Sequence, residues 1–157
     1  EYGYAIYYIK YSIFCQCPIT LFPPIVAHGI LRSIMTKIAI IEDDPVINQM
    51  YRMKFEATGF EVQLADNGKR GVALVESFQP DLILLDLQMP EMDGVEALTE
   101  IRKHDWGKSI PVIILTNMGE EESPKKIRSL GIHSYIVKAD LTPSQVVARA
   151  KEALETN

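Results

Sequence analysis

From residue 37 onward, the chain alternates five times between a short apolar run and an amphipathic stretch of helical period. The third and fourth apolar runs have no polar interruption, which is typical of strands covered by helices on both faces. Five strand–helix units in series predict an α/β fold, a doubly wound parallel sheet with right-handed crossovers. The runs predict strands at Ile38–Ile41, Phe60–Leu64, Leu82–Asp86, Val112–Thr116 and Tyr135–Val137.

Helix signals fill the intervals between these runs. Asp44 followed by Pro45 is typical of an N-cap and a first helical position. We expect the apolar face of this helix to consist of Ile47, Met50, Tyr51 and Phe55. Asp66-Asn67-Gly68 predicts a plain turn. Later helices are expected at about 69–78, 95–104 and 123–130, and after the capping box that begins at Thr142.

Residues 1–34 differ from the rest of the chain. They are apolar but broken by prolines, and they show neither helical nor strand periodicity. No run reaches the ~18 apolar residues that a membrane-spanning helix needs. We interpret them as a non-domain N-terminal extension, either disordered or an artefact of an upstream start, with Met35 as the true start of a domain at 35–157. A membrane tether and a partner-binding tail are the alternatives.

Charge and cysteine content limit the classes of function that residues 35–157 can have. The chain has a net charge of −5, and 20 of its 21 acidic residues lie in this region. A chain that binds nucleic acid directly would usually carry the opposite sign, so we expect no such binding. Both cysteines, Cys15 and Cys17, lie in the extension, and a cysteine-free domain fits a reducing compartment such as the cytoplasm.

Reactive side chains stand where the predicted strands end. Glu42 and Asp43 follow the first strand, whereas Asp86, Thr116 and Lys138 end or follow the third, fourth and fifth. The carboxyl ends of parallel strands meet at one edge of the sheet, which is where ligands bind in such folds. Clustered carboxylates favour an oxygen-ligated cation such as Mg²⁺. A carboxylate, a cation, an amine and a hydroxyl together indicate phosphoryl transfer.

Four motifs, taken in order, resemble those of a known family. They are Ile40-Ile41-Glu42-Asp43-Asp44-Pro45, the Leu-Leu-Asp-Leu-Gln-Met-Pro-Glu-Met-Asp-Gly stretch at 84–94, Ile114-Leu115-Thr116, and the Gly-Ile-His-Ser-Tyr-Ile-Val-Lys stretch at 131–138. Over residues 37–155 the chain resembles the receiver domain of two-component response regulators, as in stand-alone chemotaxis-type regulators. The resemblance implies a flavodoxin-like (βα)5 fold with strand order 2-1-3-4-5.

The resemblance also implies a role for each residue at the sheet edge. Asp86 would be the phosphoacceptor, and Lys138 would hold a phosphoryl oxygen. Thr116 would move in to bind the phosphoryl group, and Tyr135 would follow it inward as the switch. The Mg²⁺ ligands would be Glu42, Asp43, Asp86 and the backbone carbonyl of Gln88.

The function implied is that of a single-domain response regulator in a phosphorelay. A sensor histidine kinase or a histidine phosphotransfer protein would donate the phosphoryl group, and a downstream protein partner would read the phosphorylated state. The domain would not be an enzyme with a separate substrate, although it would phosphorylate and dephosphorylate itself with Mg²⁺. The expected partners include neither nucleic acid nor a membrane, and the expected location is the cytoplasm.

Some positions depart from the family pattern, and two alternatives follow. Ala139 replaces the proline that usually follows the lysine, and a trans bond is predicted there because a non-proline cis bond costs about 3–4 kcal/mol. Asn117 replaces a smaller residue. A degenerate receiver that binds partners without phosphorylation is therefore one alternative. The other is a haloacid-dehalogenase-like phosphatase, which would need an aspartate where this chain has Gln88.

Overall fold

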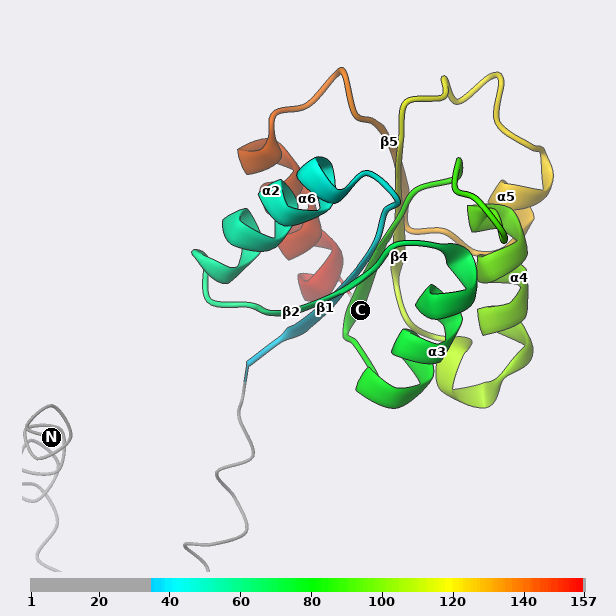
Figure 1. The fold of residues 1–157 in the computed structure, drawn as a ribbon, viewed down its shortest axis with the longest axis horizontal. Coiled ribbons are helices and arrows are strands. Elements are labelled where there is room, and N and C mark those ends of the chain that lie inside the picture. Colours follow the sequence, from blue (N-terminus) through cyan, green and yellow to red (C-terminus); the bar gives the residue numbers. More distant parts are fainter. Residues whose placement is uncertain (1–34, 157) are drawn as a thin grey trace, which may run out of the picture. The chain divides into compact units, whose positions relative to one another are not determined.

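The computed structural model describes residues 35–156, which form an α/β fold around one sheet (Figure 1). All strand pairs are parallel, and the strand order is β2-β1-β3-β4-β5. The strands are β1 (Lys37–Ile41), β2 (Glu61–Ala65), β3 (Leu82–Leu85), β4 (Val112–Thr116) and β5 (Ser134–Val137). The predicted fold class and strand order are confirmed. Our interpretation of residues 1–34 lies outside the described residues.

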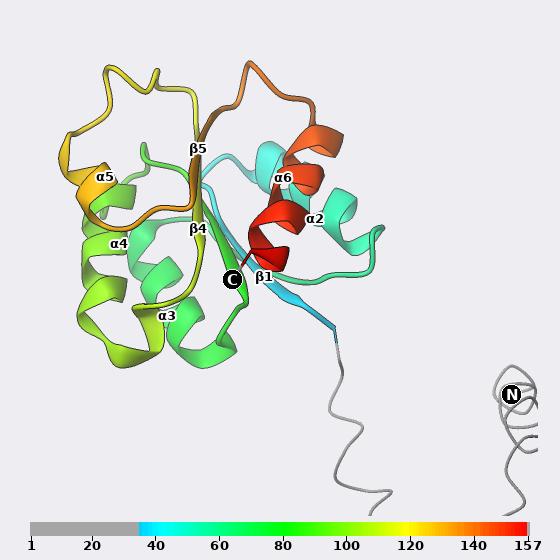
Figure 2. The same cartoon turned by 180° about the vertical axis from the view of Figure 1, so that it is seen from behind.

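Helices cover both faces of the sheet (Figures 1 and 2). On one face lie α2 (Pro45–Glu56) and α6 (Pro143–Glu155). On the other lie α3 (Gly68–Phe78), α4 (Gly94–Lys103) and α5 (Lys126–Ser129), with a short 3₁₀ helix at Asp105–Gly107. Among the described helices, none is long and apolar enough to cross a membrane.

The alternation of side chains along each strand builds two cores. In β1, Ile38 and Ile40 face α2 and α6, whereas Ala39 and Ile41 face the α3 side. Successive side chains of a strand point to opposite faces, so continuous apolar runs are buried on both sides. Every residue of β3 and β4 is buried. The two cores hold the sheet rigidly and so fix the positions of the strand ends.

Helix α2 begins as predicted but presents a different face to the core. Asp44 accepts hydrogen bonds from the N–H groups of Val46 and Ile47, at 2.8 and 3.1 Å, as an N-cap. The expected inward position of Met50 is wrong, since 40% of that residue is exposed. The buried residues of the helix are Asn48, Tyr51 and Phe55. A polar residue occupies the core stripe because the ends of two strands use its amide, as described below.

Two further local predictions are corrected. Asp66-Asn67-Gly68 is not a plain turn, because Asn67 accepts from the Arg70 N–H and caps α3, which begins at Gly68. Helix α5 covers only Lys126–Ser129, although a helix was expected over about 123–130. Ile127 is its one buried residue, and its N-terminus has no side-chain cap. A single anchor and a missing cap explain why so little of this segment is helical.

Candidate functional site

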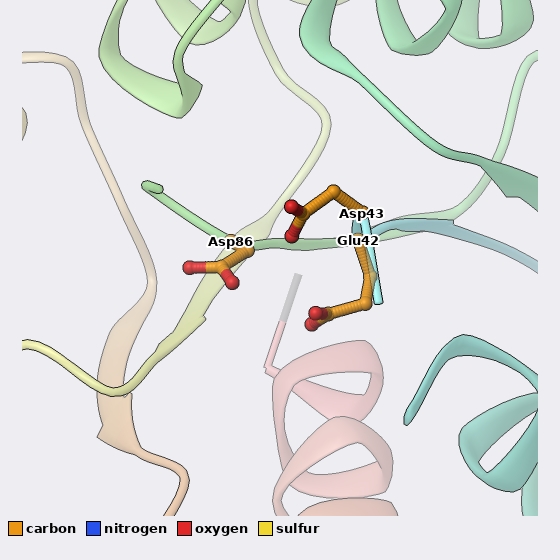
Figure 3. Close-up of side chains that lie close together, drawn as sticks. All are labelled: Glu42, Asp43 and Asp86. Atoms are coloured by element: carbon orange, nitrogen blue, oxygen red, sulfur yellow. The ribbon is translucent and has the colours of Figure 1, made fainter. Parts of the chain in front are cut away.

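Three carboxylates meet at the carboxyl edge of the sheet, as the strand ends predicted. Each of Glu42, Asp43 and Asp86 places one carboxylate oxygen within 4.8 Å of an oxygen of the other two. Figure 3 shows the three side chains beside one another, with the carboxylate of Asp43 directed toward Asp86. Glu42 and Asp86 are buried, whereas Asp43 is exposed and faces solvent at the mouth of the cluster.

Lys138 joins two of these carboxylates. Its Nζ lies 2.5 Å from Oε2 of Glu42 and 2.6 Å from Oδ2 of Asp86, and all three side chains are at most 8% exposed. The chain has no cis peptide bond among the described residues, so the predicted trans bond between Lys138 and Ala139 is confirmed. The alanine therefore does not keep the lysine from reaching the acids.

The charges of this cluster affect one another strongly. Burial raises the pKa of Glu42, although the hydrogen bond and positive charge of Lys138 oppose that rise. Burial alone would lower the pKa of Lys138, but its contacts with Asp86 and Glu42 outweigh that effect and the pKa is raised. The lysine is therefore held in its charged form between the two acids.

The remaining predicted site residues make contacts of their own. Thr116 is fully buried at the end of β4, and the Met118 N–H lies 3.5 Å from its hydroxyl. The Tyr135 hydroxyl donates to the Met118 carbonyl at 2.9 Å, so it is tied to the segment after Thr116 rather than to the acids. Gln88 donates its N–H to Oδ1 of Asp86 at 3.2 Å, and Asn117 is exposed.

Asn48 supports the site and was missed by the sequence analysis. Its Nδ2 donates to the carbonyl of Glu42 at 2.8 Å and to that of Ala65 at 3.2 Å. It thereby ties the end of β1 to the end of β2 from within the core. Its spacing from Tyr51 and Phe55, three and seven residues away, puts it on the apolar stripe of α2. A polar residue on that stripe was the available signal.

The donor set fits a hard divalent cation. The three carboxylates carry three negative charges when ionised, and Lys138 offsets one of them. All of the donors are oxygens, which suits Mg²⁺ better than zinc. Asp43, on the exposed side, keeps the cluster open to solvent. The site can therefore take up a cation together with a ligand from solution.

Comparison with known proteins agrees with this geometry. The sequence model described as response regulator receiver domain matches residues 38–151. The chain is 34% identical over 120 residues to the DNA-binding dual master transcriptional regulator RpaA of Synechocystis sp.. That alignment covers 76% of this chain but only 49% of RpaA. The chain thus spans about half the length of this curated relative.

Solved structures show the same arrangement of elements. The chemotaxis protein CheY4 of Vibrio cholerae matches with a TM-score of 0.71 and 25% identity, over 76% of this chain and 98% of that protein. The receiver domain of the sensor histidine kinase PA1611 from Pseudomonas aeruginosa, solved with magnesium coordinated in its active-site cleft, matches with a TM-score of 0.70 and 25% identity. That match covers 77% of this chain and 98% of the PA1611 domain.

Proposed function

The chain belongs to the response regulator receiver domain family, and from this premise we propose that it accepts a phosphoryl group onto Asp86 within a two-component system. The observation that carries this proposal is the pairing of Asp86 with Lys138 at 2.6 Å inside a cluster of three acids. The carboxylate of Asp86 is suited to receiving a phosphoryl group, because it lies beside a fixed positive charge and the acid cluster is open to solvent at Asp43.

The proposed step forms one bond and breaks one. A carboxylate oxygen of Asp86 attacks phosphorus while the bond between phosphorus and the donor nitrogen of a phosphohistidine breaks, which leaves an acyl phosphate on Asp86. The histidine nitrogen keeps the electron pair of the broken bond. The donor is a sensor histidine kinase or a histidine phosphotransfer protein, as the family resemblance implies.

Glu42, Asp43, Asp86 and the carbonyl of Gln88 would hold Mg²⁺. When bound, the cation offsets negative charge on the transferred group. Lys138 pairs with Asp86 and would keep an ion pair with a phosphoryl oxygen after transfer. Burial restricts its side chain, so the ammonium group is already in position before the phosphoryl group arrives.

Thr116 and Tyr135 would transmit the change. The Thr116 hydroxyl would donate to a phosphoryl oxygen and draw the segment after β4 toward Asp86. Tyr135 is bonded to that segment through Met118, so its ring would follow the same movement. A downstream protein partner would bind the altered surface. We propose no separate substrate, because the same domain accepts the phosphoryl group and loses it to water.

A receiver that binds partners without phosphorylation is the alternative. The intact set of family residues argues against it, since this chain keeps Asp86 together with Asp43, Thr116 and Lys138. The phosphatase alternative needs a second aspartate two residues after the nucleophile, and Gln88 occupies that position with its side chain exposed.

The direct test is phosphorylation by a small phosphodonor such as acetyl phosphate with Mg²⁺, read by the mass of the intact protein. One phosphoryl adduct is expected, and it should be absent in Asp86→Asn and in EDTA. An adduct that persists in Asp86→Asn would assign the acceptor to another residue. No adduct under any condition, with the folded state verified by circular dichroism, would favour the degenerate receiver.

A further inference from the structure

The segment between β3 and α4, residues 87–93 (the acceptor loop), follows Asp86 directly and ends at Asp93, the N-cap of α4. Its tip is a tight turn in which the Met92 N–H donates to the Pro90 carbonyl at 2.8 Å. Glu91, at the centre of that turn, has a φ of 66°, in the left-handed region that residues other than glycine seldom adopt. Such a conformation persists only when the surrounding structure determines it.

The first turn of α3 supplies one such contact. The Gly68 N–H donates to the Met92 carbonyl at 3.1 Å. Gly68 is the first residue of α3, so its N–H has no carbonyl partner within the helix. A Cβ on Gly68 would collide with the Met92 carbonyl oxygen and would lie 2.8 Å from the Met92 Cγ. The tip of the acceptor loop therefore lies against a position where only glycine fits.

The local helix gives no other reason for this glycine. Its φ is not among the positive values, and alanine forms helices better than glycine does. The base of the acceptor loop is held in the same way, because the Gly94 N–H donates to the Leu87 carbonyl at 3.0 Å. A Cβ on Gly94 would collide with the Asp86 carbonyl. Gln88 lies between these two glycine contacts.

We propose that Gly68 is a positioning residue for the acceptor loop, and that its close contact with Met92 fixes the place of the Gln88 carbonyl as a Mg²⁺ ligand. The inference rests on the proposed function, because it assigns that carbonyl to the metal. The three atoms nearest to a Cβ on Gly68 all belong to Met92, so Gly68 acts on the acid cluster through the loop. A side chain at residue 68 would push Met92 outward and shift the backbone that leads to Gln88.

The test compares Gly68→Ala with Gly71→Ala, which lies on the same helix. A Cβ on Gly71 would meet the Ile41 side chain at 2.7 Å, so it disturbs the core and not the acceptor loop. Isothermal titration of each full chain with Mg²⁺ gives the affinity, and the Gln88 amide resonance reports the loop without metal. Gly68→Ala should bind Mg²⁺ about tenfold to a hundredfold more weakly and shift that resonance, whereas Gly71→Ala should do neither.

Equal Mg²⁺ affinity in both variants and the wild type, with an unshifted Gln88 resonance, would overturn the inference. A wild-type chain that binds no Mg²⁺ would instead contradict the proposed function. If Gly68→Ala does not fold, Met92→Ala removes the side chain that lies over Gly68 without adding an atom. That variant should also weaken Mg²⁺ binding, and unchanged binding in it would overturn the inference as well.

Discussion

At the scale of single residues, Lys138 controls the stability of the buried acid cluster. It is nearly buried and pairs with two acids that are nearly buried themselves. Removing a charge from water costs several kcal/mol per ion, and in such a cluster the penalty is offset only while the partners remain. The lysine therefore contributes to stability mainly by preventing Glu42 and Asp86 from being buried together without compensation.

Lys138→Met is expected to destabilise the metal-free domain by about 3 kcal/mol near neutral pH, because it leaves two buried carboxylates unpaired. Burial already raises the pKa of Glu42, and loss of Lys138 raises it further. A carboxyl group with a raised pKa in the folded state stabilises that state as pH falls through that pKa. The deficit relative to wild type should thus shrink as the pH falls from neutral toward the ordinary pKa of a glutamate.

Urea unfolding in EDTA measures this difference. Trp106 is the single tryptophan of the chain and packs against the core on the α3 side, so its fluorescence follows unfolding. A deficit that is independent of pH would mean that packing, and not the charge of Lys138, accounts for the loss.

Asp43→Asn is expected to stabilise the metal-free domain and weaken Mg²⁺ binding. The substitution keeps the shape and removes one of three close negative charges. Because Asp43 is exposed and screened by solvent, the gain should be about 0.5–1 kcal/mol. Asp44→Ala is the matched control, because it removes the N-cap of α2 and should destabilise by about 1 kcal/mol. If the Asp43→Asn protein is less stable and its Mg²⁺ affinity is unchanged, Asp43 is not a Mg²⁺ ligand.

Five site residues could be placed because they stand at strand ends, and parallel strands align their ends: Glu42, Asp43, Asp86, Thr116 and Lys138. The ion pairs could not be predicted, because they depend on side-chain rotamers and on the register between β1 and β3. Asn48 was missed because it donates hydrogen bonds to two backbone carbonyls, a role that no sequence motif indicates. Tyr135, which is predicted to follow Thr116 inward, is linked to the segment after Thr116 through the Met118 carbonyl.

At the scale of elements, Arg102 joins four segments. Its guanidinium donates to the carbonyls of Ile110 and Leu130 at 2.9 Å, to that of Gly131 at 3.0 Å, and to that of Gly107. It thereby holds α4, the 3₁₀ helix, the approach to β4 and the end of α5 together. Burial lowers the pKa of this guanidinium, but an arginine stays charged at neutral pH.

Arg102→Lys should therefore destabilise the domain by about 1–3 kcal/mol, since an ammonium group cannot reproduce the planar fork that reaches several carbonyls. Arg52→Lys is the control, because Arg52 pairs with Glu56 on the surface of α2, where both side chains are more than 40% exposed. That change should cost less than about 0.5 kcal/mol. Similar urea midpoints for the two variants would show that Arg102 is not a structural link.

Element boundaries were predicted best where two signals agreed. Asp44 with Pro45 and the capping box at Thr142 each combine a cap with a proline, and both helices begin there. Asn67-Gly68 has the composition of a turn, but the Asn67 side chain caps α3 and Gly68 is the first residue of that helix. The segment around α5 has one buried anchor, Ile127, and no N-cap, so its boundaries could not be predicted from two agreeing signals.

At the scale of the whole molecule, the comparison with RpaA bears on what the domain controls after phosphorylation. RpaA is described as DNA-binding, and the chain matches less than half of its length. The single-domain arrangement, the absence of direct nucleic-acid binding and the cytoplasmic location therefore stay predictions. The charge of residues 35–157 supports the second of them, since it would repel a phosphate backbone.

Residues 1–34 are expected to be dispensable for folding and phosphorylation, because residues between Ile38 and Ala153 build both cores. A chain that starts at Met35 should keep its melting temperature within about 2 °C and accept phosphate at the same rate. A chain that starts at Ile38 is the sharper comparison. It loses the Thr36 carbonyl that accepts from the Glu61 N–H and the Lys37 carbonyl that accepts from the Asp81 N–H. It also loses the Lys37 N–H that donates to the Asp81 carboxylate and the Lys37 ammonium that donates to the Phe78 carbonyl. Four lost hydrogen bonds should lower the unfolding free energy by about 2–4 kcal/mol. If the melting temperature falls as far for the Met35 start as for the Ile38 start, the first 34 residues contribute to the fold and Met35 is not where the domain begins.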